Sequence, residues 1–195
     1  AGQERLDVKQ FDAASLLREL CDELHAQAHE RGLYLESDGS DSLIVQGDPV
    51  KTRRVAQNLL INALKYTREG GVTVNWGDSK ENDPDRWMFT VHDTGPGFHA
   101  GPGAPLASAL KAATVASHEI DRKAGVDPEA ADTNGSAIDT DRREVNQPRG
   151  EGVGLSIVKR LSDLLNATIE LESSAELGTT FRVILPRRYQ PEPSE

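Results

Sequence analysis

The segment that decides the fold reads Asn58-Leu59-Leu60-Ile61-Asn62-Ala63-Leu64-Lys65-Tyr66-Thr67. At roughly 100° per residue, its two asparagines and its lysine fall within an arc of about 60° on a helix. The apolar side chains of the segment lie on the opposite side, where they can pack on a sheet. An asparagine oxygen is a neutral hard ligand suited to Mg²⁺, and a lysine one turn further on offers a compact positive charge to phosphate. The same spacing also fits the solvated face of an ordinary amphipathic helix.

A second segment, Asp93-Thr94-Gly95-Pro96-Gly97, follows an alternating stretch that is predicted to be a strand. An ionised carboxylate only accepts hydrogen bonds, so Asp93 at the end of a strand complements the N6 amine of adenine. Guanine presents an oxygen at that position, which predicts a preference for ATP over GTP. The glycines let the backbone approach a flat base closely. Read alone, the segment is equally a plain turn.

The third segment, Gly150-Glu151-Gly152-Val153-Gly154, precedes an apolar helix that is expected to run from Gly154 through Leu165. The free N–H groups and the positive dipole end of a helix start bind anions, which suits a triphosphate. On its own, this glycine spacing is also typical of a flexible joint, and a hinge is an additional expectation here.

The rest of the chain alternates helices and short strands. Residues 11–31 are predicted to form an amphipathic helix capped by Asp12. Asp48 and Pro49 are predicted to open the helix that carries the two asparagines, which ends before Gly70. Strands are expected at residues 33–36, 43–46, 72–76, 87–92, 168–172 and 180–185, and the third and fourth of these read as a hairpin-like pair.

Residues 98–149 interrupt this pattern with a stretch rich in Ala, Gly, Asp and Pro. We expect a lid insertion there, with one helix at residues 105–120 and little regular structure at residues 127–147. The predicted division of the chain is a linker from a missing upstream domain at residues 1–10, one domain at residues 11–187 that contains the insertion, and a tail at residues 188–195.

The composition excludes several classes of protein. A net charge of −10 argues against a nucleic-acid partner or an anionic membrane surface. Cys21 is the only cysteine, which excludes a disulfide framework and a thiolate zinc site and favours a reducing compartment. No apolar run approaches the roughly 18 residues of a membrane span. We therefore expect a cytoplasmic domain without direct membrane contact, even if the parent protein is membrane-anchored.

Together and in this order, the three segments resemble the N, G1 and G2 boxes of the superfamily that includes gyrase, MutL and sensor histidine kinases. The segment from Asn58 to Thr67 is similar to the N box of the histidine kinases, whereas gyrase-like and MutL-like ATPases carry a glutamate base in place of Asn58. Gly178-Thr179-Thr180-Phe181 is similar to the G3 box. The resemblance covers about residues 11–186 but departs at residues 98–149, since kinase lids are shorter and carry an F box.

The resemblance implies an α/β (α+β) two-layer sandwich, the Bergerat ATP-binding fold, in which a mixed and mostly antiparallel sheet carries helices on one face. It implies ATP and Mg²⁺ as cofactors, Asn62 as the metal ligand, Asp93 as the reader of adenine, and Thr180 beneath the adenine pocket. The implied catalytic residues are Asn58, Asn62 and Lys65. The implied nucleotide-binding residues are Asn58, Asn62, Lys65, Tyr66, Asp93, Gly95, Gly97, Gly152, Val153, Gly154, Leu155 and Thr180.

The activity implied by the resemblance is transfer of the ATP γ-phosphoryl group to a histidine on a separate dimerisation hairpin domain of the same parent protein. The receiver domain of a response regulator is the implied downstream partner. Two alternatives stay open. One is a nucleotide-binding or protein-docking module of the same fold that has lost catalysis. The other is a serine-directed relative such as an anti-sigma kinase, which the Lys65-Tyr66-Thr67 sequence disfavours.

Three histidines outside these segments have simpler interpretations. Ser117-His118-Glu119 mimics an acceptor motif, but it follows the N box and lacks the usual proline, so we interpret it as a chance match. His25 and His29 share a predicted helix face without a third metal ligand, and we interpret them as a solvated pair.

Overall fold

The computed structural model describes residues 5–79, 83–96, 153–174 and 176–189. The described elements are, in chain order, β1 (Lys9–Asp12), α1 (Ala13–Glu30), β2 (Tyr34–Gly39), β3 (Ile44–Gly47), α2 (Pro49–Tyr66), β4 (Gly71–Asp78), β5 (Arg86–Asp93), α4 (Val153–Leu164), β6 (Thr168–Ser174) and β7 (Gly178–Pro186). The predicted lid insertion, with its helix at residues 105–120 and His118, lies outside the described residues, as do Gly97 and Gly152.

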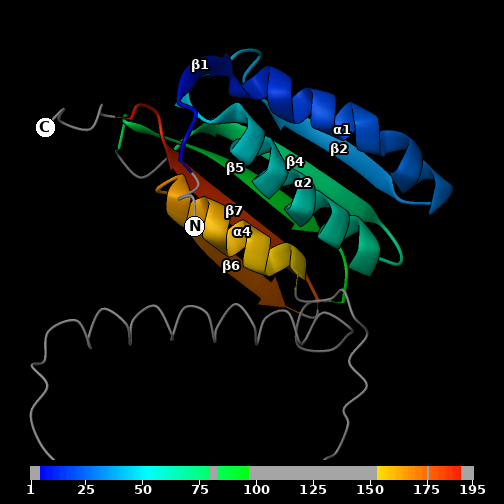
Figure 1. The fold of residues 1–195 in the computed structure, drawn as a ribbon. Coiled ribbons are helices and arrows are strands. Elements are labelled where there is room, and N and C mark those ends of the chain that lie inside the picture. Colours follow the sequence, from blue (N-terminus) through cyan, green and yellow to red (C-terminus); the bar gives the residue numbers. More distant parts are fainter. Residues whose placement is uncertain (1–4, 80–82, 97–152, 175, 190–195) are drawn as a thin grey trace, which may run out of the picture.

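The large sheet has the strand order β2-β4-β5-β7-β6. All of its neighbouring pairs are antiparallel except β2 with β4, which run parallel. Figure 1 shows α1, α2 and α4 side by side on one face of this sheet. The predicted two-layer sandwich with a mixed, mostly antiparallel sheet is therefore confirmed, as is the antiparallel pairing of the strands around residues 72–76 and 87–92.

A second, two-stranded sheet pairs β1 with β3, and it corrects the predicted start of the first helix. Phe11 and Asp12 belong to β1, so the first helix begins at Ala13 rather than at residue 11. Asp12 does cap this helix, and its carboxylate also accepts the Leu43 N–H at 2.8 Å, which ties the helix start to the segment before β3. The strands expected at residues 33–36 and 43–46 exist, but they lie in different sheets.

Helix α2 begins as its sequence predicts. The Asp48 side chain accepts the Lys51 N–H at 3.0 Å, and Pro49 occupies the first turn, where its missing N–H costs no hydrogen bond. The helix ends at Tyr66, and the Thr67 N–H donates to the Ala63 carbonyl. One side of α2 is buried through Leu59, Leu60 and Leu64, which leaves the asparagine side facing away from the sheet.

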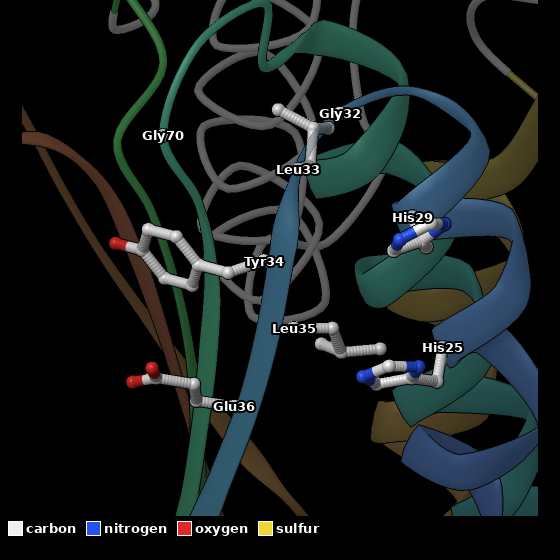
Figure 2. Close-up of a pocket in the computed structure, with 8 residues that line it drawn as sticks. All are labelled: His25, His29, Gly32, Leu33, Tyr34, Leu35, Glu36 and Gly70. Carbon is white, nitrogen blue, oxygen red and sulfur yellow. The ribbon is translucent and has the colours of Figure 1, made fainter.

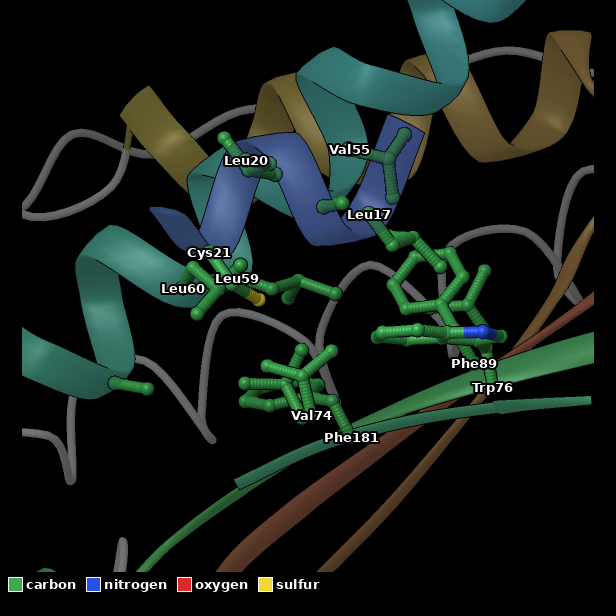
Figure 3. Close-up of a cluster of buried hydrophobic side chains, with 14 of the residues drawn as sticks. Leu17, Leu20, Cys21, Val55, Leu59, Leu60, Val74, Trp76, Phe89 and Phe181 are labelled. Carbon is green, nitrogen blue, oxygen red and sulfur yellow. The ribbon is translucent and has the colours of Figure 1, made fainter. Parts of the chain in front are cut away.

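The hydrophobic core lies between the helices and the large sheet (Figure 3). Alternate residues of β5 point to the helices, and Trp87, Phe89 and Val91 are each no more than 1% exposed. Leu17 of α1 and Leu59 of α2 pack against this face and are fully buried. Each such side chain contributes roughly 1.5–3 kcal/mol relative to an exposed one, so this layer holds the sheet and helices in register. Within the described helices, none combines the length and apolar character needed to cross a bilayer.

Candidate nucleotide-binding site

The asparagine face of α2 lies against the start of α4. A Cβ atom built on Gly154 would lie 3.4 Å from Asn58 Oδ1 and 3.5 Å from Asn62 Nδ2. The structure therefore brings the first and third predicted segments together, with two side-chain amides facing a helix N-terminus. Asn58 Nδ2 donates to the Arg54 carbonyl at 2.7 Å, which turns its oxygen toward Gly154. This arrangement suits an anion accompanied by a metal ion.

Asn62 is the better candidate for the metal ligand because its amide is not engaged. Its Nδ2 atom is buried and has no hydrogen-bond partner among the described residues. A buried polar atom without a partner costs about 1–3 kcal/mol, so it marks a place where a further group is expected. A hydrated Mg²⁺ ion that also carries phosphate oxygens fits this donor set, since water and phosphate can accept from the amide while its oxygen faces the metal.

Lys65 and Tyr66 lie at the C-terminal end of α2. Lys65 is exposed, and its Nζ atom lies 5.1 Å from the centroid of the Tyr66 ring. The Lys65 carbonyl accepts a hydrogen bond of 3.1 Å from Arg31, which holds the helix end against the segment after α1. The lysine charge is thus available at the same face as the asparagines but nearer the end of the helix.

Asp93 ends β5 with its side chain on the helix face of the sheet. The residue is 8% exposed, and its Oδ1 atom accepts the Gly95 N–H at 2.9 Å. Burial raises the pKa of this carboxyl above its ordinary value of 3.8, although hydrogen bonds from the Gly95 and Thr179 N–H groups and the nearby His92 act in the opposite direction. A buried carboxylate with acceptor capacity to spare is suited to a ligand that donates hydrogen bonds.

The turn after Asp93 reaches the end of α2. A Cβ atom on Gly95 would lie 3.5 Å from Thr67 Oγ1 and 3.6 Å from the Tyr66 carbonyl oxygen. Thr67 is fully buried, and its hydroxyl donates to the Ala63 carbonyl at 2.7 Å. The second predicted segment therefore meets the first at this point. The first segment forms the C-terminal half of α2. The Asp93 turn lies at the end of this helix, and the start of α4 lies beside its middle.

Two of the predicted residues lie elsewhere. Thr180 is on the sheet face away from the helices, where its hydroxyl lies 2.9 Å from His92 Nδ1, so its side chain does not share the Asp93 face. Leu155 is 3% exposed and belongs to the hydrophobic core, which leaves only its backbone at the start of α4. Val153 begins that helix.

Thr179 lies beside Asp93 but was not among the site residues predicted from the sequence. It pairs with Asp93 in the register of β5 and β7, is 4% exposed, and its backbone N–H acts to lower the pKa of the Asp93 carboxyl. The signal that identifies it is the alternation of β7, because Phe181 and Val183 are buried and must share a face with Thr179. Gly178 before it adopts φ +82°, and any Cβ there would collide with the Asp93 carbonyl oxygen.

The remaining histidines do not join this site. His25 and His29 line a separate hollow of about 570 Å³ between α1 and β2 (Figure 2). In the described part of the chain, no group of three or more His, Cys, Asp or Glu side chains is placed to hold a metal ion.

A family model described as histidine kinase-, DNA gyrase B- and HSP90-like ATPase matches residues 47–189. The chain belongs to this family. Within it, the resemblance to sensor histidine kinases is supported by curated relatives. The circadian input-output histidine kinase CikA of Synechococcus elongatus is 29% identical over 198 residues, which cover 100% of this chain and 22% of CikA. The virulence sensor protein BvgS of Bordetella bronchiseptica is 30% identical over 162 residues, 81% of this chain and 11% of BvgS.

Solved structures agree with the family. Full-length ShkA in complex with AMPPNP is similar with a TM-score of 0.66 and 25% identity, covering 95% of this chain and 32% of ShkA. The catalytic domain of the histidine kinase ThkA has a TM-score of 0.63 at 18% identity, covers 93% of this chain and 97% of that domain, and shows the shared fold. The chain spans less than a quarter of CikA and of BvgS. Its fold and family are those of the ATP-binding catalytic domain of sensor histidine kinases.

Proposed function

We propose that this domain binds ATP with Mg²⁺ and transfers the γ-phosphoryl group to a histidine on a separate hairpin domain of the same parent protein. The observation that carries the proposal is the position of the Asn58 and Asn62 amides, which lie 3.4 and 3.5 Å from where a Cβ atom on Gly154, at the start of α4, would be. Two amides opposite a helix N-terminus suit a metal-bound phosphate chain. The sensor-kinase relatives and the AMPPNP bound in the ShkA structure support the same assignment.

Each residue of the phosphate side has a distinct task in this proposal. Asn62 ligates the metal through its amide oxygen, which its unpartnered and buried Nδ2 atom favours. Asn58, held by the Arg54 carbonyl, supports the metal and phosphate region. Lys65 supplies a positive charge to the phosphates from the exposed end of the helix, and the backbone N–H of Gly154 adds a donor at the helix start.

The adenine side is built around Asp93. Its carboxylate accepts from the adenine amine, while the Gly95 and Thr179 N–H groups fix its orientation. We place Thr179 in this pocket instead of Thr180, because Thr179 lies on the Asp93 face. Guanine would set an oxygen against the carboxylate, so ATP is preferred over GTP.

Catalysis in this proposal consists of positioning and charge neutralisation. When bound, Mg-ATP supplies the phosphoryl group, and the protein holds it in place with its amides, Lys65 and the helix start. Asn58 is a neutral amide and cannot accept a proton as a general base, so it orients groups without activating a water molecule. Any base for the acceptor histidine then belongs to the hairpin domain. The downstream partner in this proposal is a response regulator receiver domain.

The test is transfer of radiolabel from γ-labelled ATP to the purified hairpin domain of the parent protein. We expect labelling of one histidine that requires Mg²⁺, and loss of labelling in Asn62→Ala. Gln27→Ala, which removes an exposed amide on α1, serves as the matched control and should keep its activity. Tight ATP binding without any transfer would instead support the docking-module alternative. Absence of ATP binding would contradict both.

A further inference from the structure

Strand β2 is an edge of the large sheet. Among the described residues it pairs only with β4, on one side, through residues 34–39. An edge strand presents N–H and C=O groups on its open side, and such groups can pair with another extended chain. The strand is six residues long and is therefore long enough to pair with a short segment.

A hollow of about 570 Å³ lies at this edge. Figure 2 shows His25 and His29 projecting from α1 on one side of β2, while Tyr34 and Glu36 project on the other. Because side chains from both faces of β2 line the hollow, the hollow extends along the open edge. The edge is thus accessible to a chain approaching in the plane of the sheet.

The outer side of the edge carries unpaired negative charge. Glu36 and Asp38 alternate along β2 on the same face and are both exposed. Neither carboxylate forms an ion pair with another described residue. Their cross-strand neighbours in β4, Thr73 and Asn75, are uncharged. A strand added to this edge would therefore meet two carboxylates that have no cation.

These charges argue against pairing of β2 with a second copy of itself. A continuous antiparallel sheet through a two-fold axis places residues of the same face opposite each other. In the two registers that pair the most residues of β2, Glu36 would lie opposite Glu36 or Asp38 of the second copy. Like charges directly opposite are destabilising in a sheet, whereas opposite charges are favourable. The edge selects against self-association and for a basic partner.

We propose that the open edge of β2 is a docking site for an extended segment of another protein, which joins the sheet as a sixth strand. The segment carries Lys or Arg at alternate positions, where they face Glu36 and Asp38. Tyr34, which is 42% exposed, offers its ring to a third cation of the same row. The intervening side chains of the segment face His25 and His29 across the hollow.

The probe is the capped hexapeptide of alternating lysine and valine, titrated into isotope-labelled protein and followed by NMR. We expect shifts that centre on residues 34–39 and slower amide exchange on that strand. The double variant Glu36→Lys and Asp38→Lys should weaken binding about tenfold or more, because two attractive pairs become repulsive. ATP binding should not change in this variant, so the result is independent of the proposed function.

Two controls separate strand addition from general attraction to an acidic protein. The same hexapeptide with methyl groups on the amides that face β2 keeps its charge but cannot pair, and it should not bind. The variant Glu172→Lys and Glu176→Lys makes the same charge change at the β6 end of the sheet and should bind the hexapeptide nearly as well as the original protein. Equal binding of the methylated peptide, shifts centred elsewhere, no binding, or dimerisation of the protein through β2 would each overturn the proposal.

Discussion

At the scale of single residues, Asp93 is a buried carboxyl whose charged form is disfavoured by the fold but needed for its proposed function. Its pKa is raised chiefly by burial, so the folded domain binds a proton more readily than the unfolded chain does. The free energy of unfolding therefore falls as the pH rises from about the ordinary value of 3.8 through the folded pKa. At neutral pH the charge is a net cost to the fold, which is typical of a residue kept for its ligand.

Replacing Asp93 with Asn should separate stability from binding. We expect Asp93→Asn at pH 7 to have a free energy of unfolding equal to that of the original protein or up to about 1 kcal/mol higher, with ATP affinity lowered roughly 5- to 150-fold by the loss of a buried acceptor. Chemical denaturation and calorimetry measure the two quantities. Asp163→Asn, at an exposed carboxylate of α4, is the control. An unchanged affinity would mean that Asp93 does not read the base.

Gly154 offers a second test at this scale. An alanine Cβ would sit at ordinary contact distance from Asn58 and Asn62, so the fold should accept it. Alanine also favours a helix over glycine by roughly 0.5–1 kcal/mol. The methyl group nevertheless fills the space between the amides and the helix start.

For Gly154→Ala we therefore expect an equal or higher Tm, together with Mg-ATP affinity lowered about tenfold or more by a crowding cost of about 1–3 kcal/mol. Gly77→Ala, whose Cβ would come no closer than 3.9 Å to a neighbour, is the matched control. Thermal unfolding and calorimetry on both variants decide the point. Normal nucleotide affinity in Gly154→Ala would show that the nucleotide does not bind between the amides of α2 and the start of α4.

The residue types of the site could be predicted from the sequence, but one position could not. The spacing of Asn58, Asn62 and Lys65 identifies a helix face from the sequence alone, because a helix has a fixed period. Thr179 and Thr180 are adjacent and identical, so choosing between them requires the face of β7. The alternation of Phe181 and Val183 puts Thr179 on the buried face, but the position of that face beside Asp93 depends on pairing with β5, a long-range contact that local patterns do not encode.

At the scale of elements, the start of α2 is held by one buried carboxylate. Asp48 is 1% exposed, and it accepts from the Lys51 N–H, from Lys51 Nζ at 2.8 Å and from the Asp7 N–H at 3.0 Å. Burial alone would raise the pKa of this carboxyl, but the hydrogen bonds and charge of Lys51 and the Asp7 N–H lower it below its ordinary value. The same side chain thus caps the helix that carries the asparagines and anchors the segment before β1.

Removing this carboxylate should destabilise the domain in a pH-dependent way. For Asp48→Ala we expect a loss of about 2–4 kcal/mol at pH 7, from a lost cap and from donors left buried without an acceptor. Asp48→Asn keeps the cap and should lose less. The folded pKa of Asp48 is lowered, so its charge contributes fully to the free energy of unfolding above the ordinary value of 3.8. This contribution disappears as the pH falls through the folded pKa. Urea unfolding across this range measures it, and a difference that does not vary with pH would contradict the role of the charge.

Helix starts were predictable from the sequence, whereas strand partners were not. Asp12 and Asp48 mark their helices because capping is local chemistry. Residues 9–12 were not predicted as a strand, since β1 is short and is stabilised by pairing with β3, more than 30 residues away. The sequence likewise does not tell that β2 and β3, neighbours in the chain, belong to different sheets.

At the scale of the whole molecule, the proposed nucleotide site joins elements that come from well-separated parts of the chain. It draws on α2, the end of β5 and the start of α4, which is the first described element after residue 96. A ligand that touches all three should stabilise the assembled domain, because binding to the folded state alone shifts the unfolding equilibrium.

Mg-ATP at a concentration of 100 times its Kd should therefore raise the free energy of unfolding by about 2.7 kcal/mol, and for a chain of this size each kcal/mol corresponds to a Tm rise of about 2–4 °C. GTP at the same concentration, or ATP with the metal chelated, should give a clearly smaller rise, since Asp93 selects the base and Asn62 acts through the metal. Scanning fluorimetry with matched ionic strength measures all three. Asp93→Asn should lose the difference between ATP and GTP, and Asn62→Ala should lose the metal dependence. If each variant kept both differences, the nucleotide would be bound by other residues.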